Sequence, residues 1–551
     1  MMVSSFDIFD TCVVRKCGAP RNLFDVLSYR VFYKEVSEEH RIEFITQRAA
    51  ADDSSSFDHL YNTFDYFHPF LLPQNEIMQK ELNCEREMMV PVKSMLEEVN
   101  KCRQRGDHII FISDMYLPTS FIQTALSELG FFKGEDSIYI SGDTGLTKHD
   151  GSLYKWVKEK EEIEFVNWQH YGDNIVSDIQ IPSNLGITVH PVNHCYLPYE
   201  DAWIASSNNL TFHTGGIMAG IGRSIYHSIE EHPHNAFAID ITAPFTVSFT
   251  LRIMNDAAKR GIQELYFCSR DCYAMYHVAK KLERIVPKVK AHYYYTSREA
   301  LYNTQEEELI SYLTSIGLAQ TDNIVGIVDI RSSGKSLKYT NHLLEKHGYK
   351  SVFGYYFEMY CMNSFIKDVP PYYCEINTQF CNLSTIHHQL IERFISICPE
   401  GRTVGYRDNQ PILSASNENE DSFIDNIDTL SEVNLSILER YADCVIETEL
   451  YRHISEVFLS FVIQTIRRFF SSPDKEYLLS LPLFHILQED GSYAPYIEKK
   501  NKNIAYHIAF LAQTSNTRMT RRSMKLLMRA FRIPPIRIDD WWPEGTKVYN
   551  S

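Results

Sequence analysis

Polar side chains that could carry out chemistry on a phosphate group are spread over the first third of the chain. An aspartate can attack phosphorus when a divalent cation screens the repulsion between the two anions. A lysine and a hydroxyl group can then hold the phosphoryl oxygens. The residues that supply these parts are, in chain order, Asp7, Asp10, Thr11, Ser113, Asp114, Lys148, Asp173 and Asp178.

These side chains follow or lie between strand-like runs. The runs are SSFDIFD, HIIFIS (108–113), SIYIS (137–141) and the segment that ends in WQHYGD (168–173). Helical patterns such as TSFIQTALSELG (119–130) separate them. Strands that alternate with helices predict an α/β domain with a parallel sheet. Such sheets bind ligands at the carboxyl ends of their strands, where these side chains would meet.

The order of these residues resembles the haloacid-dehalogenase-like hydrolase superfamily, most of whose members are phosphatases. Its four motifs match in register as FDIFDT, ISD, Lys148 and GDNxxSD, over about residues 4–195. The resemblance implies a Rossmann-like dehalogenase-type phosphatase domain at 1–200. The mostly helical stretch at about 17–105 would be its cap.

The same resemblance assigns roles to the residues. Asp7 would be the nucleophile, and Mg²⁺ would be held by Asp7, the backbone carbonyl of Phe9 and Asp173. Asp178 would orient Lys148 or a metal-bound water, and is counted with the metal ligands. The phosphoryl group and its surroundings would be bound by Thr11, Ser113, Asp114 and Lys148.

Phe9 departs from the phosphatase pattern, which places a second aspartate two residues after the nucleophile as the acid for the leaving oxygen. Two alternatives stay open: Asp10 replaces the missing acid, or water protonates the leaving alcohol. An aspartate after a strand is often only a turn residue or a helix cap. For Asp10 and Asp178 that structural reading stays open.

A second candidate site lies in NIVGIVDIRSSGKSLKYTNHLLEKHG (323–348). Here an apolar, β-branched strand is expected to end at Asp329, before a Ser/Gly loop and a helix that starts near Ser336. Such a loop directs backbone N–H groups and hydroxyls at an anion, with the helix N-terminus behind it. The letters GKS suggest a Walker loop, but Asp329 stands where that motif needs its first glycine.

This stretch resembles the phosphoribosyl pyrophosphate loop of phosphoribosyltransferases. Asp329 matches the first acidic position of that loop, and Ile330 replaces the second. The resemblance implies that Asp329 binds the ribose hydroxyls. The 5-phosphate would be held by Ser332, Ser333, Gly334, Lys335 and Ser336.

Four segments extend the resemblance to a set of bacterial two-domain proteins. They are 265–282, 293–301, 328–336 and 391–406. In that set a dehalogenase-like phosphatase is fused to a phosphoribosyltransferase-like glycosyltransferase. The transferase moves 5-phosphoribosyl from phosphoribosyl pyrophosphate to a glycan acceptor, and the phosphatase removes the 5-phosphate, which adds ribofuranose to surface polysaccharides. The resemblance implies a bifunctional enzyme with a phosphoribosyltransferase-like α/β domain at 205–415.

Four further residues receive roles in the transfer. Arg270 and Arg298 each follow a serine at a strand-to-helix turn, and with Mg²⁺ they could stabilise the departing diphosphate. Asp271 or Glu392 could take the proton of the acceptor. An Arg–Asp pair after a strand is also a common structural ion pair, and this reading stays open.

The remaining C-terminal region, 416–551, has mostly helical patterns. Its segment 516–542 is basic and amphipathic within an acidic chain. This segment could rest on an anionic membrane surface, where lipid-linked acceptors lie, or it could grip the acceptor itself. A helix that packs on the protein body is the alternative.

Composition limits the remaining functions. A formal charge of −17 argues against nucleic acid as a partner, and 12 cysteines without CxxC pairs suggest reduced thiols. With no signal peptide and no apolar run of membrane-spanning length, we expect a cytoplasmic protein, at most peripheral at the inner membrane face. Two other functions stay open: a phosphatase whose second domain only binds a ligand, and a non-catalytic scaffold of a polysaccharide assembly complex.

Overall fold

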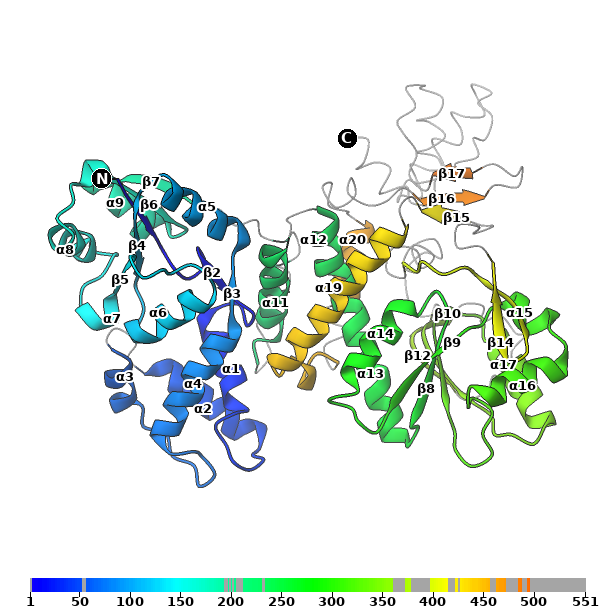
Figure 1. Ribbon diagram of the computed structural model, residues 1–551. Helices are drawn as coiled ribbons and strands as arrows, with labels where there is room; N and C mark the ends of the chain where they lie inside the picture. The colour runs from blue at the N-terminus through cyan, green and yellow to red at the C-terminus, as the bar shows by residue number, and fades with distance from the viewer. Residues whose placement is uncertain are drawn as a thin grey trace, which may run out of the picture. The chain divides into compact units, whose positions relative to one another are not determined.

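The computed structural model divides the chain into two compact units (Figure 1). The first unit comprises Met1–His232 and Asp443–Ile454, and the second comprises Pro233–Ala442 and Ser455–Ser551. The residues that the structure describes are 2–51, 56–192, 197, 200, 203–204, 212–229, 233–359, 372–377, 397–414, 422–424, 427–455, 462–471, 484–487 and 493–495.

A five-stranded parallel sheet forms the centre of the first unit. Its strand order is β5-β4-β1-β6-β7, so that β1 lies between β4 and β6. The chain builds one half of the sheet before the other, and the strand order therefore reverses beside β1. The strands are β1 (Val3–Phe6), β4 (His108–Ser113), β5 (Ser137–Ile140), β6 (Trp168–Gly172) and β7 (Thr188–Pro191). The predicted α/β fold with a parallel sheet is confirmed here.

Helices pack on this sheet through apolar faces. Val3 of β1 and Ile110 of β4 share a buried cluster with Leu153 and Val157, which lie one turn apart on α8. The helical elements between the strands are α5 (Lys93–Gln104), α6 (Thr119–Glu128), α7 (Ser141–Thr144), α8 (Ser152–Lys160), η2 (Phe165–Asn167), η3 (Ile175–Gln180) and α9 (Ile181–Leu185), and α11 (Thr214–Ser228) follows the sheet.

A helical insertion separates β1 from β4. It begins and ends with a two-stranded antiparallel ribbon, in which Val14 pairs with Val90. The elements of this insertion are β2 (Val13–Arg15), η1 (Pro20–Asn22), α1 (Leu23–Ser28), α2 (Glu38–Ala50), α3 (Phe57–Thr63), α4 (Gln74–Met88) and β3 (Met89–Pro91). The stretch expected to be the cap is therefore mostly helical, with a strand pair at its base.

Buried ion pairs hold α4 in place. Arg48 of α2 donates from Nε to Oε2 of Glu81 at 2.7 Å, and both side chains are almost completely buried. Tyr61 and Tyr116 add hydroxyl hydrogen bonds to the same carboxylate, at 2.6 and 3.2 Å. Tyr116 belongs to the loop after β4, so Glu81 connects the helical insertion to a loop at the carboxyl edge of the sheet.

The second unit contains its own five-stranded parallel sheet. Its order is β12-β11-β10-β8-β9, and the strand order reverses between β8 and β10. The strands are β8 (Glu264–Cys268), β9 (Lys290–Tyr294), β10 (Gly326–Ser332), β11 (Phe353–Met359) and β12 (Tyr372–Asn377). The α/β architecture is thus present, while the phosphoribosyltransferase-like identity of this unit stays a prediction.

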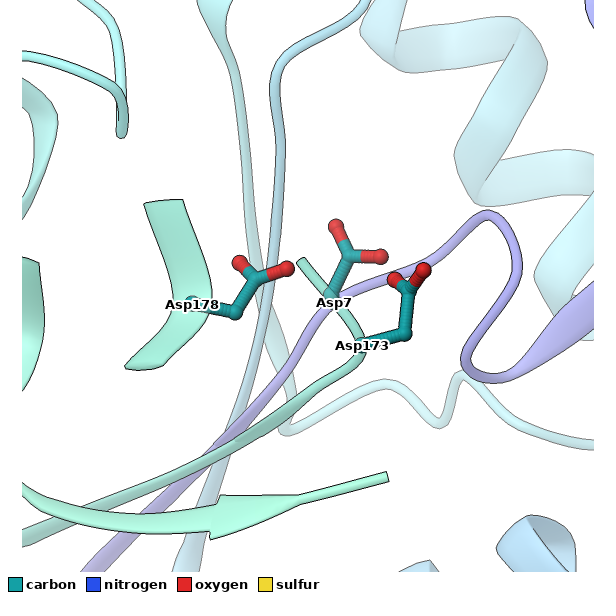
Figure 2. A group of neighbouring side chains, drawn as sticks. All are labelled: Asp7, Asp173 and Asp178. Carbon is teal, nitrogen blue, oxygen red and sulfur yellow. The ribbon is translucent and has the colours of Figure 1, made fainter. Parts of the chain in front are cut away.

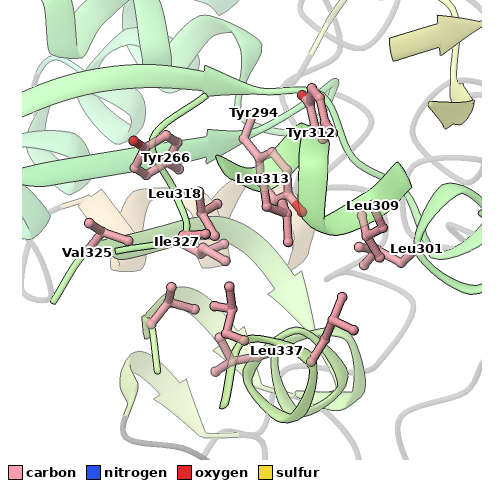
Figure 3. Packing of buried hydrophobic residues seen from close by; sticks show 14 of the residues in the cluster. Tyr266, Tyr294, Leu301, Leu309, Tyr312, Leu313, Leu318, Val325, Ile327 and Leu337 are labelled. Atoms are coloured by element: carbon pink, nitrogen blue, oxygen red, sulfur yellow. The ribbon is translucent and has the colours of Figure 1, made fainter. Parts of the chain in front are cut away.

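An aromatic and aliphatic core lies on one side of this second sheet (Figure 3). Tyr266 of β8, Tyr294 of β9 and Ile327 of β10 meet Leu313 and Leu337 from the helices that follow. The helical elements of this part of the unit are α12 (Pro233–Phe237), η4 (Ala238–Thr242), α13 (Ala243–Arg260), α14 (Tyr273–Leu282), α15 (Arg298–Asn303), α16 (Glu306–Ser315) and α17 (Lys335–Lys346).

One helical stretch, Asn235–Arg260, is long and apolar enough to cross a membrane. Its most apolar window is 94% buried inside the protein, as is usual for a core helix. Among the described residues it is the one such stretch. From the sequence we expect no membrane-spanning segment, because polar residues such as Asp240 and Thr246 interrupt this apolar run.

The C-terminal region is less uniformly helical than its sequence pattern predicts. From residue 416 onward the described residues form α19 (Ile427–Glu447), η5 (Leu450–Arg452) and α20 (Gln464–Ser471), but also a three-stranded antiparallel sheet. Its strands β15 (Ser422–Ile424), β16 (Phe484–Leu487) and β17 (Tyr493–Pro495) are too short to give a recognisable alternating pattern. The hairpin β13 (Thr403–Arg407) and β14 (Gln410–Leu413) precedes this region. The basic segment 516–542 lies outside the described residues.

Candidate functional site

The carboxyl ends of β1 and β6 bring three aspartates together in the first unit, with their carboxylates turned toward one another (Figure 2). Asp7 follows β1 directly, and its backbone N–H donates to the carbonyl of Tyr171 at 2.9 Å. Asp173 follows β6, and Asp178 lies in the π-helical segment η3. Ligand oxygens of the three carboxylates lie within 4.8 Å of one another. The switch point of the sheet therefore carries a compact anionic cluster.

The Lys148 side chain enters this cluster from the loop before α8. Its Nζ lies 2.5 Å from Oδ1 of Asp7 and 2.6 Å from Oδ1 of Asp178, and the side chain is 3% exposed. Burial alone would lower the pKa of Lys148, but the charges of Asp7 and Asp178 raise it well above its ordinary value. The lysine is therefore a permanent ammonium that bridges two carboxylates.

One ammonium cannot compensate three carboxylates. Burial raises the pKa of Asp7 to about 8, and the contact with Lys148 only partly offsets this. Burial together with the charges of Asp10 and Asp178 raises the pKa of Asp173 to about 6. Without a further cation the three carboxylates cannot all ionise easily, because the charge of one ionised carboxylate opposes the ionisation of its neighbours.

The cluster fits a divalent cation such as Mg²⁺. Its donors are carboxylate oxygens, which this hard cation prefers, and they converge from two strand ends. Thr11 donates from Oγ1 to Oδ1 of Asp173 at 3.3 Å and so orients that carboxylate, while its role in substrate binding stays a prediction. The Phe9 ring lies 3.9 Å below the Arg15 guanidinium. Its side chain is thus held by the buried Arg15–Glu85 ion pair, and brings no acid to the site.

Asp114 holds the loop that carries Lys148. Its carboxylate accepts hydrogen bonds from the backbone N–H of Lys148, at 2.8 and 3.0 Å, and from that of His149 at 3.2 Å. Both oxygens of Asp114 accept hydrogen bonds from this loop, so the residue positions Lys148. Its role in substrate binding stays a prediction. Ser113, the last residue of β4, is buried beside it at the same strand edge.

Asp178 can approach the cluster because Gly172 leaves room for it. A Cβ atom at position 172 would lie 2.5 Å from Cβ and Cγ of Asp178, which no ordinary contact allows. The backbone N–H of Asn174 donates to Oδ2 of Asp178 at 3.0 Å. Burial disfavours the charged form, but Lys148 and a hydrogen bond from His170 hold the pKa of Asp178 below its usual range.

Asp10 lies at the rim of the site. Its backbone has a left-handed conformation with φ of 57°, and its N–H donates to the carbonyl of Val13 at 2.7 Å. Its side chain is 38% exposed, and Oδ1 lies 3.6 Å from Nη1 of Arg223 on α11. Arg223 also forms an ion pair with the buried Glu200. Arg223 and Glu200 could not be predicted from the sequence, because no local motif links α11 to the loop after β1.

The predicted residues of the second unit also come together. A cavity of about 290 Å³ opens at the carboxyl ends of β8, β9 and β10, where the strand order reverses. The sequence-predicted residues that line it are Arg270, Asp271, Arg298, Asp329, Ser332, Ser333 and Ser336.

Asp329 lies inside β10, which continues to Ser332 instead of ending at the aspartate. Burial and the charge of Asp271 raise the pKa of Asp329 to about 8. Gly334 has φ of 77°, and its N–H donates to Oγ of Ser332 at 3.1 Å, which shapes the turn that leads into α17. Only a residue without a side chain takes up this conformation readily.

Three residues predicted for this site, Gly334, Lys335 and Glu392, are not in the cavity lining. Lys335 begins α17 and is exposed, because the first residue of the helix projects outward from the turn. Glu392 lies outside the described residues. Arg270, by contrast, lines the cavity with φ of 65°, and its backbone N–H donates to the hydroxyl of Tyr293 at 3.0 Å. A non-glycine residue in this left-handed region costs on the order of 1–3 kcal/mol, and such strained residues cluster at functional sites.

Sequence reasoning also missed two arginines of the cavity. Arg331 reaches Oε2 of the buried Glu358 from Nε at 3.1 Å, and Arg402 reaches Oε2 of Glu299 from Nη2 at 2.8 Å. Arg402 stands just before β13, far along the chain from the β10 loop. The cavity thus combines four guanidinium groups with two aspartates and several hydroxyls, a set suited to a polyanion that also carries hydroxyl groups.

Comparisons with known proteins add structural neighbours for the N-terminal part. No protein-family model matches the chain, and no curated protein matches it. A HAD phosphatase from Thermococcus onnurineus matches with a TM-score of 0.27 and 16% identity, over 35% of this chain and 87% of that one. The putative HAD-hydrolase YfnB from Bacillus subtilis, solved with magnesium, matches with a TM-score of 0.26 and 15% identity, over 35% and 88%.

A HAD-family enzyme from Bacteroides thetaiotaomicron, solved with magnesium and inorganic phosphate, is a further neighbour. It matches with a TM-score of 0.25 and 13% identity, over 35% of this chain and 94% of that one. The matched part of this chain is N-terminal. Likeness at these TM-scores and identities places the chain in no family, and the chemistry of both sites rests on the geometry of this chain alone.

Proposed function

We propose that the first unit is a Mg²⁺-dependent phosphatase of phosphate monoesters, with Asp7 as the nucleophile. The observation that carries this proposal is the placement of Asp7 at the switch point of the sheet, in contact with Lys148 and beside Asp173 and Asp178. A carboxylate, a buried ammonium and a cation-binding cluster are the parts that phosphoryl transfer to an aspartate needs.

Asp7, Asp173 and Asp178, with the backbone carbonyl of Phe9, would hold the Mg²⁺ ion. When bound, the ion supplies positive charge that screens the repulsion between Asp7 and the phosphate group. The raised pKa values of Asp7 and Asp173 support this assignment, because the bare cluster lacks one or two positive charges.

The residues of the chain would act in two displacements. An Asp7 carboxylate oxygen attacks phosphorus, and the bond from phosphorus to the leaving oxygen breaks with its electron pair on that oxygen. Lys148 and the Ser113 hydroxyl stabilise the charge on the phosphoryl oxygens. The leaving oxygen takes a proton from Asp10 or from water, since Phe9 offers none. A water molecule then attacks the phosphorus of phospho-Asp7 and gives a proton to Asp10 or to solvent water. The bond from phosphorus to the Asp7 oxygen breaks with its electron pair on that oxygen, which releases inorganic phosphate and restores the carboxylate.

Phosphate release from p-nitrophenyl phosphate and ribose 5-phosphate in the presence of Mg²⁺ tests this proposal. Asp7→Asn should reduce kcat by more than about 10³-fold, as is usual when a nucleophile is removed. The matched control Asp58→Asn changes an exposed aspartate of α3 and should leave kcat unchanged. Full activity in a folded Asp7→Asn protein would refute the assignment.

We further propose that the second unit transfers 5-phosphoribosyl from phosphoribosyl pyrophosphate to a glycan acceptor. The supporting observation is the cavity that collects Asp329, Arg270, Arg298 and the loop hydroxyls at the switch point of the second sheet. The two activities together would add ribofuranose to a polysaccharide in the cytoplasm, with at most peripheral contact to the inner membrane face.

In this transfer the anomeric C–O bond to diphosphate breaks, and the electron pair leaves with the diphosphate. The acceptor hydroxyl oxygen forms the new bond to the anomeric carbon and gives its proton to Asp271. Arg270 and Arg298 would bind the diphosphate, and the serines before α17 would bind the 5-phosphate. Asp329 would accept hydrogen bonds from the ribose hydroxyls.

Isothermal titration calorimetry with phosphoribosyl pyrophosphate and Mg²⁺ tests donor binding. Asp329→Ala should weaken binding at least about tenfold, because two ribose hydroxyls lose their hydrogen-bond acceptor. Asp322→Ala changes an exposed aspartate just before β10 and serves as the control. Unchanged affinity in Asp329→Ala would contradict this proposal and leave the phosphatase proposal intact.

A further inference from the structure

A chain of buried polar side chains runs through the centre of the first sheet, beneath the Asp7 site. Ser5 lies in β1, and Trp168 and His170 lie in the neighbouring strand β6, with all three at 0% exposure. Central strands of parallel sheets are normally continuous apolar runs. Polar groups buried here must be hydrogen-bonded to be tolerated, and their partners therefore reveal what they do.

The hydrogen bonds of Ser5 fix the direction of the chain. Trp168 can only donate, and its Nε1–H lies 2.7 Å from Oγ of Ser5. The single hydroxyl hydrogen of Ser5 can then go to Nδ1 of His170 at 2.7 Å, or to the carbonyl of Gln169 at 3.5 Å. The shorter contact is the favourable one, so Nδ1 of His170 is an acceptor and the ring proton lies on Nε2.

The Nε2–H of His170 points at the active site. The Nε2 atom lies 3.2 Å from Oδ1 of Asp178 and 3.0 Å from the hydroxyl oxygen of Tyr154, so the one N–H is shared between two acceptors, and the negative charge of Asp178 makes the carboxylate the stronger one. Tyr154 uses its own hydrogen on the carbonyl of Ser177 at 2.9 Å, and so can only accept from the histidine. The oxygen of Asp178 that faces His170 is the same one that accepts from Lys148 at 2.6 Å.

We propose that His170 is a positioning residue of the Asp7 site. As an imidazole with its proton on Nε2, it fixes the Asp178 carboxylate, and through Asp178 it fixes the Lys148 ammonium against Asp7. The effect on catalysis rests on the proposed phosphatase function. The orientation of the Asp178 carboxylate by His170 does not depend on that function.

A neutral donor suits this position better than a cation. A second positive charge at Asp178 would compete with Lys148 for the same oxygen and weaken the contact that places the ammonium. Burial lowers the pKa of His170, which agrees with the neutral ring that the hydrogen-bond directions require. Every polar group in the network from Trp168 to Lys148 has a hydrogen-bond partner. Complete buried networks of this kind fix the orientation of their side chains, here that of the Asp178 carboxylate.

Kinetics of three variants with p-nitrophenyl phosphate and Mg²⁺ separate positioning from packing. His170→Phe fills the same space without a donor, and His170→Gln returns an N–H near the Nε2 position. His190→Phe is the matched control, because His190 lies on the adjacent strand β7 and bonds Gln169 at 3.1 Å, away from Asp178.

His170→Phe should lower kcat by about 10–100-fold, the usual effect of losing a hydrogen bond that orients a functional ligand, with KM nearly unchanged. His170→Gln should recover most of kcat, and His190→Phe should behave as the wild type. Wild-type kcat in His170→Phe would overturn the proposal. So would a folded His170→Gln that is no better than His170→Phe.

Nitrogen NMR of the protein labelled with ¹⁵N-histidine gives a readout that needs no activity. His170 should show the neutral ring with its proton on Nε2, and its signals should move in Asp178→Asn while those of His190 stay in place. A proton on Nδ1 of His170 would overturn the proposal. So would His170 signals that do not shift in the Asp178→Asn variant. If the wild type hydrolyses no phosphate ester while His170 shows the expected pattern, the phosphatase proposal fails and the hold on Asp178 stands.

Discussion

The Lys148 ammonium lies 2.5 Å from the Asp7 carboxylate, although 141 positions separate the two residues in the chain. The contact exists because β1 and the loop before α8 meet at one edge of the sheet, and because Asp114 holds the backbone of Lys148 there. The same ammonium serves Asp178, so the pair is not an isolated salt bridge. It is the centre of a cluster that is short of positive charge.

Replacement of the lysine tests its part in charge stabilisation. Lys148→Met should lower kcat for p-nitrophenyl phosphate by about 10²–10³-fold, because a preorganised cation is lost from the phosphoryl oxygens. Lys155→Met changes an exposed lysine of α8 and is the control for the helix that follows the loop. Equal activity of both variants in steady-state assays would show that Lys148 only balances charge in the folded protein.

The raised pKa of Asp329 predicts a pH-dependent cost to stability. The folded-state pKa of about 8 lies above the ordinary aspartate value, so the folded protein favours the protonated form. The stability that protonated Asp329 contributes to the folded state is fully present below about pH 4, the ordinary aspartate pKa. It is lost as the pH rises through the folded-state pKa of about 8. Asp329→Asn should therefore raise Tm more at pH 8 than at pH 5.

Differential scanning calorimetry of wild type and variant at the two pH values measures this difference. Asp322→Asn, at an exposed position, should show the same small Tm change at both. A Tm gain of Asp329→Asn that does not grow with pH would contradict the burial of a carboxylate beside Asp271.

The ion pair between Arg48 and Glu81 predicts a large effect in the helical insertion. Arg48→Met leaves the buried Glu81 carboxylate without its cation, and should destabilise the protein by roughly 3–5 kcal/mol. The double variant Arg48→Met/Glu81→Leu should recover much of the loss, since no unpaired charge remains. Urea unfolding followed by circular dichroism measures these differences.

The exposed pair Arg86–Glu128 offers a matched control for that series. Its side chains are 53% and 43% exposed, and Arg86→Met should cost about 0–1 kcal/mol. If Arg48→Met were as mild as Arg86→Met, Glu81 would have to find another partner in the variant, and the view that Arg48 holds α4 would be wrong.

The order of the two proposed reactions gives a product-based prediction. The donor loop needs the 5-phosphate as its anchor, so transfer should precede dephosphorylation. With a glycan acceptor and phosphoribosyl pyrophosphate, Asp7→Asn should accumulate a product heavier than the wild-type product by one phosphate. Asp329→Ala should form no product, and mass spectrometry distinguishes all three.

Mixing the variants tests whether the two sites work independently. Asp329→Ala retains the first site, and should remove the phosphate from the product of Asp7→Asn. If the mixture leaves this product unchanged while the wild type converts it, the two-site relay would be wrong.

The sequence predicts four of the five strands of the first sheet, β1, β4, β5 and β6, because these strands carry strong local signals. The run HIIFIS coincides with β4, and the run that ends at Asp173 leads to β6, since apolar stretches bounded by turn residues leave little choice. The aspartates after β1 and β6 meet because parallel strands end at one edge. The three-carboxylate cluster could therefore be anticipated from motif order alone.

The tasks of individual polar residues could not be predicted in the same way. Thr11 and Asp114 point their hydrogen bonds at Asp173 and at the Lys148 backbone, and only the fold decides this direction. Arg223 and Arg402 reach the two sites from elements far along the chain. No sequence motif near Arg223 or Arg402 indicates that their long side chains reach a distant site, so these contacts cannot be predicted from the sequence.

The central claim is that Asp7 becomes phosphorylated during turnover. The most direct measurement is a rapid acid quench of the protein with p-nitrophenyl phosphate and Mg²⁺, followed by mass spectrometry of the peptide that contains Asp7. We predict a gain of one phosphoryl group on Asp7 in the wild type, larger in amount when water attack is slower than its formation, and no gain in Asp7→Asn. Steady turnover of substrate with no phosphoryl group on Asp7, or with the group on another residue, would contradict the account.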